Sequence, residues 1–149
     1  MKIAIGSDHA AIEAKQVISE LLTEGGHQVE DCGTQGSDSV DYPDFADAVC
    51  QRIDLDSADL GILICGTGIG MSIAANKVDG IRAALCRTEF EAQMARAHNN
   101  ANVLCLGARV TGKDLMLAIV NRFMSTPFDG GRHERRIEKI HALERRQGD

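Results

Sequence analysis

Short apolar runs alternate with segments of helical periodicity along this chain. The apolar runs predict five strands, at 2–6, 28–32, 60–65, 81–85 and 103–106. Each run is brief and mostly apolar, as in strands that a sheet buries on both faces. Because strands that alternate with helices build parallel sheets, we predict an α/β fold: a single-domain, Rossmann-like three-layer sandwich with a five-stranded parallel sheet.

The helical segment after the first strand has an apolar side and a polar side. The residues predicted to face the core are Val17, Ile18, Leu21 and Leu22, and those predicted to face solvent are Ile12, Lys15, Gln16, Ser19 and Glu20. The last helix, expected at about 133–146, is the most charged segment of the chain. The polar stretch 33–39 is too long for a tight turn, so we expect this loop at a functional edge.

Signals for helix ends are also present. They are two pairs at or near capping-box spacing, Thr88 with Glu91 and Thr111 with Asp114, and two glycine pairs that mark helix ends, Gly25-Gly26 and Gly130-Gly131. These signals divide the chain into helices that fit between the predicted strands.

Length and charge narrow the class of protein. A chain of 149 residues predicts one domain, 1–149, and 44% hydrophobic with 26% charged residues is an ordinary globular composition. A net charge of −6, with one Tyr and no Trp, argues against nucleic acid as a partner. An anionic ligand would therefore need local donors such as backbone amides or placed Arg and His residues.

The apolar runs and the cysteines indicate a cytoplasmic protein. No run approaches the roughly 20 residues that cross a bilayer, and the first strand reaches Asp8 before a signal-peptide core could form. The cysteines, at 32, 50, 65, 86 and 105, are odd in number and lack C-x-x-C or zinc-type spacing. We expect reduced thiols, no metal and no membrane partner.

The strongest local signal is a glycine-rich turn after the third strand, at 65–72. Alternating glycines at 66, 68 and 70 can expose backbone amides as a nest that stabilises a phosphate, a carboxylate or a developing oxyanion. The alternative is a plain strand-to-helix turn. Dinucleotide, Walker and cysteine-phosphatase loops all fail at Met71, which stands where each requires another residue.

Cys65 is the one cysteine for which the sequence suggests a functional role. A thiol beside an amide nest is favoured as thiolate and can act as base or nucleophile. From its position alone, Cys65 is equally well interpreted as a buried cysteine at the end of a strand. The other cysteines, Cys32, Cys50, Cys86 and Cys105, are interpreted as core residues.

Three further polar residues belong to the same edge of the predicted sheet. Asp8 and His9 follow the first strand and Arg109 follows the fifth, so they are expected near Cys65 at the carboxyl ends of the strands. Asp8 is as often a helix N-cap, and His9 could be an exposed loop residue.

A second group of polar residues falls at the opposite edge. His98 and Asn99 precede the fifth strand, about 17 Å from Cys65 if five strand residues intervene. Arg132 and Arg136, one helical turn apart, share this placement. One interpretation makes His98 an ordinary residue at a helix C-terminus and the arginine pair a solvated basic face. The other is that the site is shared between subunits.

Several of these motifs, in order along nearly the whole chain, resemble the ribose-5-phosphate isomerase B family. The matching segments are Gly6-Ser7-Asp8-His9, Asp41-Tyr42-Pro43, Cys65-Gly66-Thr67-Gly68-Ile69-Gly70, Ala74-Ala75-Asn76-Lys77, Gly80-Ile81-Arg82, His98-Asn99 and Gly130-Gly131-Arg132-His133. The family also includes galactose-6-phosphate isomerase subunits and allose-6-phosphate isomerases. Fold and reaction type therefore carry over more safely than the sugar.

The resemblance implies a cofactor-free enzyme of the pentose phosphate pathway that interconverts ribose 5-phosphate and ribulose 5-phosphate through a cis-enediolate. Cys65 would be the base. One branch of the family has a carboxylate at the position of Met71, and a methionine cannot ionise. The amides of Gly66, Thr67, Gly68, Ile69 and Gly70 would hold the enediolate oxygen. His98 with Thr67 would open the sugar ring, Asp8 and Asn99 would orient hydroxyls, and His9, Arg109, Arg132 and Arg136 would bind phosphate.

The resemblance also implies a homodimer or a dimer of dimers with a shared site, in which the last helix reaches a partner subunit. Three alternatives stay open: isomerisation of a hexose 6-phosphate such as allose 6-phosphate, a phosphosugar sensor without turnover, and thiol-dependent phosphatase chemistry. The remaining histidines, His27, His133 and His141, are predicted to be surface residues.

Overall fold

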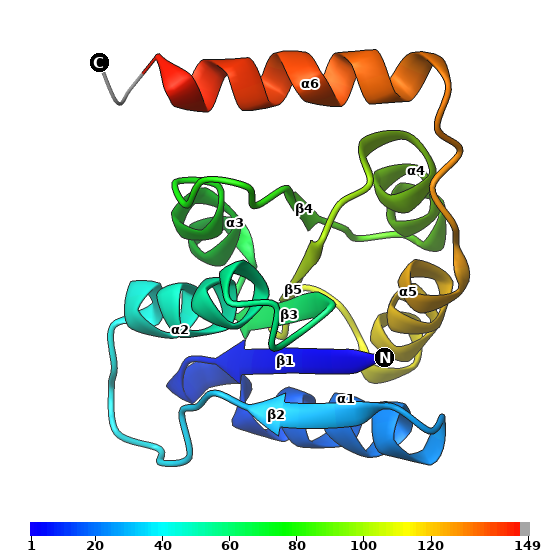
Figure 1. The fold of residues 1–149 in the computed structure, drawn as a ribbon. Helices are drawn as coiled ribbons and strands as arrows, with labels where there is room; N and C mark the ends of the chain where they lie inside the picture. Colours follow the sequence, from blue (N-terminus) through cyan, green and yellow to red (C-terminus); the bar gives the residue numbers. More distant parts are fainter. Residues whose placement is uncertain (147–149) are drawn as a thin grey trace.

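A five-stranded parallel sheet forms the centre of the computed structural model, which describes residues 1–146 (Figure 1). The strands are β1 (Lys2–Ser7), β2 (Gln28–Asp31), β3 (Leu60–Cys65), β4 (Ala83–Leu85) and β5 (Val103–Gly107). Their order is β2-β1-β3-β5-β4, and every neighbouring pair is parallel. The predicted fold class is confirmed.

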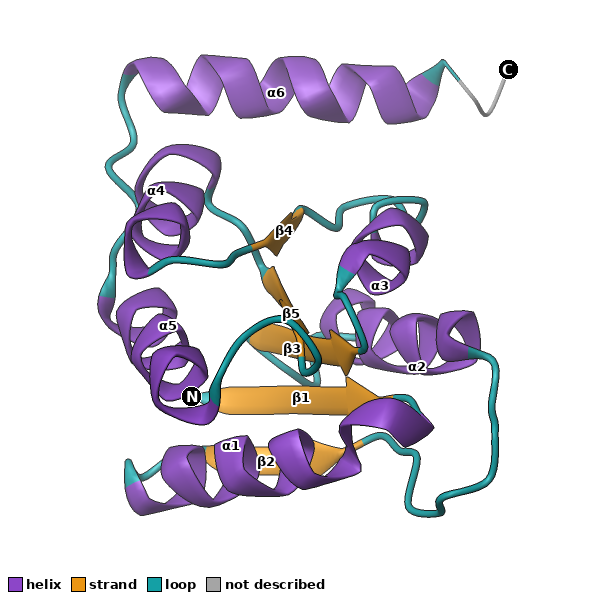
Figure 2. Cartoon of the chain, turned by 180° about the vertical axis from the view of Figure 1, so that it is seen from behind, coloured by secondary structure: helices purple, strands orange, loops and turns teal. Residues whose placement is uncertain are grey.

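Helices cover both faces of this sheet. They are the short 3-10 helix η1 (His9–Ala11), α1 (Ile12–Glu24), α2 (Tyr42–Asp54), α3 (Ile69–Ala75), α4 (Glu89–Asn99), α5 (Lys113–Ser125) and α6 (Arg132–Arg145). One core cluster joins the sheet to α1, α4 and α5, and a second joins it to α2 and α3. In Figures 1 and 2, α6 runs apart from these layers, beyond α4, β4 and α3. No helix among residues 1–146 has the length and apolarity needed to cross a membrane.

Alternation along β3 decides which face each side chain joins. Ile62 and Ile64 lie in the cluster with α1, α4 and α5, whereas Leu63 and Cys65 lie in the cluster with α2 and α3. All four side chains are buried. Burying an Ile or Leu side chain contributes roughly 1.5–3 kcal/mol, so this alternation fixes β3 in register and places Cys65 beneath α3.

Two of the four helix-end signals hold as predicted. Thr88 accepts a hydrogen bond from the Glu91 amide while the Glu91 carboxylate accepts from the Thr88 amide, forming a complete capping box. Gly25 caps the C-terminus of α1.

The other two signals were wrong in position. The N-cap of α5 is Gly112, and the neighbouring Thr111 is buried with its amide bonded to the Gly107 carbonyl. Gly131 precedes the first turn of α6, while α5 has already ended at Ser125. A short polar residue or a glycine at a helix boundary satisfies several local geometries, so spacing alone does not choose among them.

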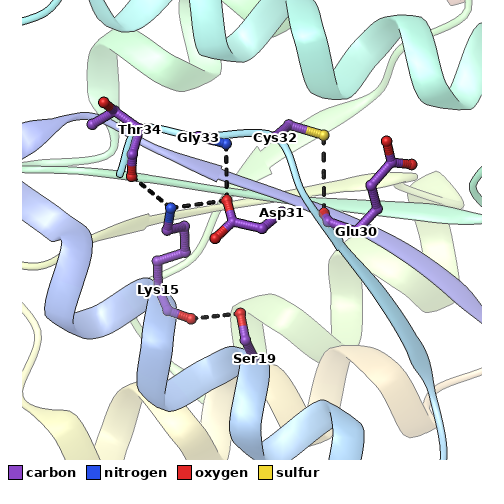
Figure 3. Close-up of polar contacts among 7 residues, drawn as sticks. All are labelled: Lys15, Ser19, Glu30, Asp31, Cys32, Gly33 and Thr34. Atoms are coloured by element: carbon purple, nitrogen blue, oxygen red, sulfur yellow. Dashed lines mark hydrogen bonds and ion pairs between the residues drawn. The ribbon is translucent and has the colours of Figure 1, made fainter. Parts of the chain in front are cut away.

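Lys15 corrects the predicted orientation of α1. Its side chain is 3% exposed, and Nζ donates to Asp31 Oδ1 at 2.8 Å and to the Thr34 carbonyl at 2.6 Å (Figure 3). Burial acts to raise the pKa of Asp31, but hydrogen bonds from Lys15, Gln35 and the Gly33 amide outweigh it and lower that pKa. The ammonium can be buried because a carboxylate and a carbonyl replace its water. This pair ties α1 to the loop that follows β2.

Candidate active site

Cys65 ends β3 beside the glycine-rich turn. The Sγ atom accepts a hydrogen bond from the Gly68 amide at 3.1 Å, and the residue is 5% exposed. This contact fixes the sulfur beside the backbone amides of the turn. Gly68 can direct its amide back to Cys65 because its φ of 77° lies in the left-handed region.

The turn presents further amides at the start of α3. The Ile69 amide donates to Thr67 Oγ1 at 3.2 Å, and the first bond to a carbonyl one helical turn back is from Ser72 to Gly68. The Gly70 and Met71 amides lie between these two and have no intrahelical acceptor. The turn is therefore a set of donors that suits an anionic oxygen, as the sequence predicts.

Arg109 lies against this turn, as expected from its place after β5. Its amide donates to the Gly66 carbonyl at 2.9 Å, and a Cβ on Gly66 would come 3.3 Å from Arg109 Nη1. The glycine thus makes room for the guanidinium beside Cys65. Tyr42 approaches from α2, since a Cβ on Gly70 would come 2.9 Å from its hydroxyl oxygen. Tyr42 has no predicted role, although it lies in a motif that carries the family resemblance.

Asp8 and His9 join the same edge through η1. The Asp8 amide donates to the Ile64 carbonyl at 3.2 Å, while Oδ1 caps η1 by accepting from the Ala10 amide at 3.0 Å. The N-cap interpretation of Asp8 is therefore confirmed. Nδ1 of His9 accepts from the Val40 amide at 3.2 Å, so this half-buried ring contacts the loop 32–41 and is not an exposed loop residue.

The second group of predicted residues lies at the other end of the sheet. Register pairs Cys65 with Gly107 at the end of β5, whereas His98 and Asn99 precede Val103 at its beginning. Arg132 and Arg136 lie on α6, which contacts this same end of α4, and both are exposed. One chain brings together Cys65, Thr67, Asp8, His9 and Arg109, and separately His98, Asn99, Arg132 and Arg136.

His133 and His141 are not the surface residues that the sequence predicts. The His133 ring is buried and stacks on His98, with ring centroids 4.2 Å apart and planes 9° apart. Burial, and then the positive charges of His98, Arg132 and Arg136, lower the pKa of His133. Nε2 of His141 lies 3.0 Å from Arg82 Nη1. Amphipathic spacing on α6 could have indicated His133, which shares a face with the buried Ile137 four residues later.

Asp129 completes a cluster with these two stacked rings. Ligand atoms of His98, Asp129 and His133 all lie within 4.8 Å of one another, a spacing compatible with a metal ion. Imidazole lone pairs lie in the ring plane, and the two planes are nearly parallel. They do not converge on one ion without rotation of a ring, so the arrangement favours stacking over metal ligation.

Other cysteines of the chain are held as thiols. Burial raises the pKa of Cys50 and of Cys86 to about 12, and it raises the pKa of Cys105 well above the usual value. The partly buried Cys32 also has a raised pKa, caused first by burial and then by Glu30. These four groups are protonated at neutral pH, which agrees with their assignment as core residues.

These features define the class: a Rossmann-like α/β domain with a thiol and an amide nest at the carboxyl ends of its strands. The sequence profile of a family described as Ribose/Galactose Isomerase matches residues 3–140. Ribose-5-phosphate isomerase B of Escherichia coli (strain K12) is 46% identical over 146 residues, 98% of each chain. This chain belongs to the Ribose/Galactose Isomerase family, so the resemblance drawn from its motifs is confirmed.

Solved structures agree with this membership. A structure of Clostridium thermocellum Ribose-5-Phosphate Isomerase B superposes with a TM-score of 0.97 at 50% identity, covering 99% of both chains. Ribose-5-phosphate Isomerase B from Mycoplasma genitalium, solved with bound Ribulose-5-phosphate, gives a TM-score of 0.93 at 47% identity over 97% of this chain and 96% of that one. Both superpositions cover nearly the whole chain.

Proposed function

We propose that this chain interconverts ribose 5-phosphate and ribulose 5-phosphate. The observation that carries the proposal is the position of the Cys65 sulfur, which accepts a hydrogen bond from the Gly68 amide. In the same turn, the amides of Gly70 and Met71 lack intrahelical acceptors. A base next to donors for a developing oxyanion is what enediolate chemistry requires. Relatives of this length named ribose-5-phosphate isomerase B, one of them with ribulose 5-phosphate bound, support the choice of sugar.

Cys65 is the base in this proposal. Its thiolate takes the proton from C2 of the open-chain aldose, the C2–H electrons form the C1–C2 double bond, and the carbonyl electrons move to O1. The resulting cis-enediolate is held by the amides of Gly66 to Gly70. O2 then passes its hydroxyl proton to O1, and Cys65 returns its proton to C1, leaving the ketone at C2. No atom is gained or lost, and the steps need no cofactor.

The remaining roles follow the two groups of residues. His98 and Thr67 open the sugar ring by moving a proton between the anomeric hydroxyl and the ring oxygen. Asp8 and Asn99 orient hydroxyls. The phosphate is bound by His9, Arg109, Arg132 and Arg136, of which Arg109 already lies against Gly66.

These roles require two subunits. Cys65 is level with the end of β5, whereas His98 precedes the beginning of that strand, so one chain does not bring them to the same substrate. We propose a homodimer, alone or paired as a dimer of dimers, in which α6 extends to the partner. Exposed Ile140 and Leu143 on α6 are the apolar side chains that such a contact would bury. The five free cysteines suit the reducing cytoplasm.

The first test measures ketose formation from ribose 5-phosphate and from allose 6-phosphate in chelator, with free phosphate assayed in the same samples. Ketose from ribose 5-phosphate without phosphate release supports the proposal. Faster turnover of allose 6-phosphate would assign the chain to hexose phosphates, and phosphate release would indicate phosphatase chemistry. Binding of both sugars without turnover would indicate a phosphosugar sensor.

A second test addresses the shared site. Inactive Cys65→Ala and inactive His98→Asn proteins are mixed, dissociated and reassociated. Each hybrid dimer has one site with both native groups, so we expect about one quarter of the native activity from a random mixture. No recovery, with hybrids shown to form, would refute the shared site.

A further inference from the structure

Arg82 makes an unusual number of contacts for a residue to which neither the sequence nor the proposed mechanism gives a role. It precedes β4, and its side chain is half-buried. Nε donates to the carbonyls of Asn99 and Asn100, both at 3.1 Å, and Nη2 donates to the Asn100 carbonyl at 2.9 Å. Nη1 reaches the Gly80 carbonyl at 3.3 Å and His141 Nε2 at 3.0 Å.

The contacts to Asn99 and Asn100 cap α4. The last carbonyls of a helix lack intrahelical donors and carry partial negative charge, which a cation stabilises. Asn100 turns the chain with a φ of 42°, and the Arg82 guanidinium fills the space where those carbonyls converge. The burial that this requires lowers the pKa of Arg82, yet the group stays a cation because arginine titrates far above neutral pH. The cap holds the turn of helix that carries His98 and Asn99.

The contact to His141 reaches α6. A guanidinium only donates, so Nε2 of His141 is the acceptor in this contact. The same loop makes a second link, in which the Gly80 amide donates to the Glu144 carboxylate at 3.0 Å. Arg82 therefore joins the end of α4 to the C-terminal half of α6, the helix that carries Arg132 and Arg136.

We propose that Arg82 is the positioning residue for the half-site that one subunit supplies to its partner. This half-site consists of His98, Asn99, Arg132 and Arg136, and the inference rests on the proposed function. A planar fork of donors can satisfy α4 and α6 at once, which a single ammonium cannot do with the same geometry. Arg82 sets the relative placement of the two helices and touches no substrate.

Arg82→Gln tests this role, with Arg82→Lys as a second variant that keeps the charge. We expect kcat to fall at least tenfold in Arg82→Gln, and Arg82→Lys to recover only part of the loss. The matched control is Arg96→Gln, which also removes a half-buried guanidinium at the end of α4, where Nη1 binds Asn100 Oδ1 and the Ala101 carbonyl. Arg96 has no bond to α6 among residues 1–146, so we expect its kcat within about threefold of native. Equal losses of kcat in Arg82→Gln and Arg96→Gln would show that the effect comes from a general loss of stability at the end of α4, and this would overturn the inference.

Hybrid dimers decide which half of the site is affected. Arg82→Gln mixed with Cys65→Ala should recover about one quarter of native activity, because one site combines a native Cys65 with a native supplied half. Arg82→Gln mixed with His98→Asn should show no gain, because both lesions fall in the supplied half. The reverse pattern would place Arg82 on the Cys65 side and overturn the inference.

One control separates this inference from the proposed function. If Cys65→Ala with His98→Asn recovers activity and the Arg82 mixtures do not follow the stated pattern, the shared site stands and the role of Arg82 falls. If that control pair also fails to recover, with hybrids shown to form, the shared site is refuted and the role of Arg82 with it.

Discussion

Gly107 and Thr67 pack backbone against backbone where β5 meets the glycine-rich turn. A Cβ on Gly107 would lie 2.6 Å from both the carbonyl carbon and the carbonyl oxygen of Thr67. Such a distance leaves no room for a side chain, so the turn beside Cys65 is held in place by a residue of another strand. The shape of the amide nest therefore depends on β5 as much as on its own glycines.

We expect Gly107→Ala to displace the turn. Overpacking costs about 1–3 kcal/mol, and the shift would move the amides that face the reacting oxygen, so kcat should fall at least tenfold. Gly112→Ala is the matched control, since its Cβ would meet nothing within 4 Å and its φ of −66° suits alanine. Thermal melts and steady-state kinetics on both variants check this. Native kcat in Gly107→Ala would show that the turn tolerates the displacement.

Cys65→Ala should abolish isomerisation while the protein still binds a phosphosugar. Removing a general base costs roughly 10²–10⁴-fold in rate, and the Cys65 sulfur accepts a hydrogen bond from the Gly68 amide of the nest. Loss of solvent deuterium incorporation at C1, with binding kept in calorimetry, is the expected signature. Cys105→Ala, which removes a buried thiol from the same core cluster, controls for packing. An active Cys65→Ala enzyme would eliminate the thiolate as base.

Lys15→Met should destabilise the fold and loosen the loop after β2. The change leaves Asp31 without its buried partner. We expect the free energy of unfolding to fall by about 2 kcal/mol, less than for a fully buried pair, because the carboxylate is 36% exposed and water screens it. The lowered pKa of Asp31 stabilises the native state above the unfolded value of about 3.9, and this contribution is lost as pH falls through the native pKa. The difference between native and variant in denaturant unfolding should therefore shrink in acid. A difference that does not change with pH would contradict an electrostatic origin.

The lowered pKa of His133 makes stability rise with pH, as that of Asp31 does, but in a higher range of pH. Between that pKa and the unfolded value of about 6.5, the unfolded state binds more protons, so the free energy of unfolding should rise with pH. Asp129 works against this shift, while His98, Arg132 and Arg136 reinforce it. His133→Gln should flatten the slope measured by urea unfolding from pH 5 to pH 7. An unaltered slope in His133→Gln would refute the assignment.

Local pattern was sufficient for much of the fold. The third strand is predicted at 60–65 and found at Leu60–Cys65, because an apolar run of 6 residues that ends at a glycine-rich turn is too short for a buried helix. The fourth strand was predicted at 81–85, but only Ala83–Leu85 pair with β5. Ile81 is apolar because it packs in the core before the strand begins, so hydrophobicity overstated the pairing.

The candidate site divides in the same way. Glycine spacing and strand ends predicted that Cys65 and Arg109 would lie together, since parallel strands end at one edge of a sheet. The sequence also placed His98 at the opposite edge, where the structure has it. Tyr42 against Gly70, the His98–His133 stack and the contacts of Arg82 were not predicted, because each joins residues far apart in the chain.

The sequence by itself determined the parallel sheet, the amide nest and the edge of the sheet to which each polar group belongs, because these follow from periods of two and 3.6 residues and from glycine spacing. Only the tertiary structure decided that Lys15 is buried against Asp31, that His133 stacks on His98 and that Gly107 confines Thr67. Periodicity encodes which side of an element is apolar. It does not encode which distant carboxylate, ring or backbone segment meets that side, and that meeting decides whether a polar or charged group can leave water.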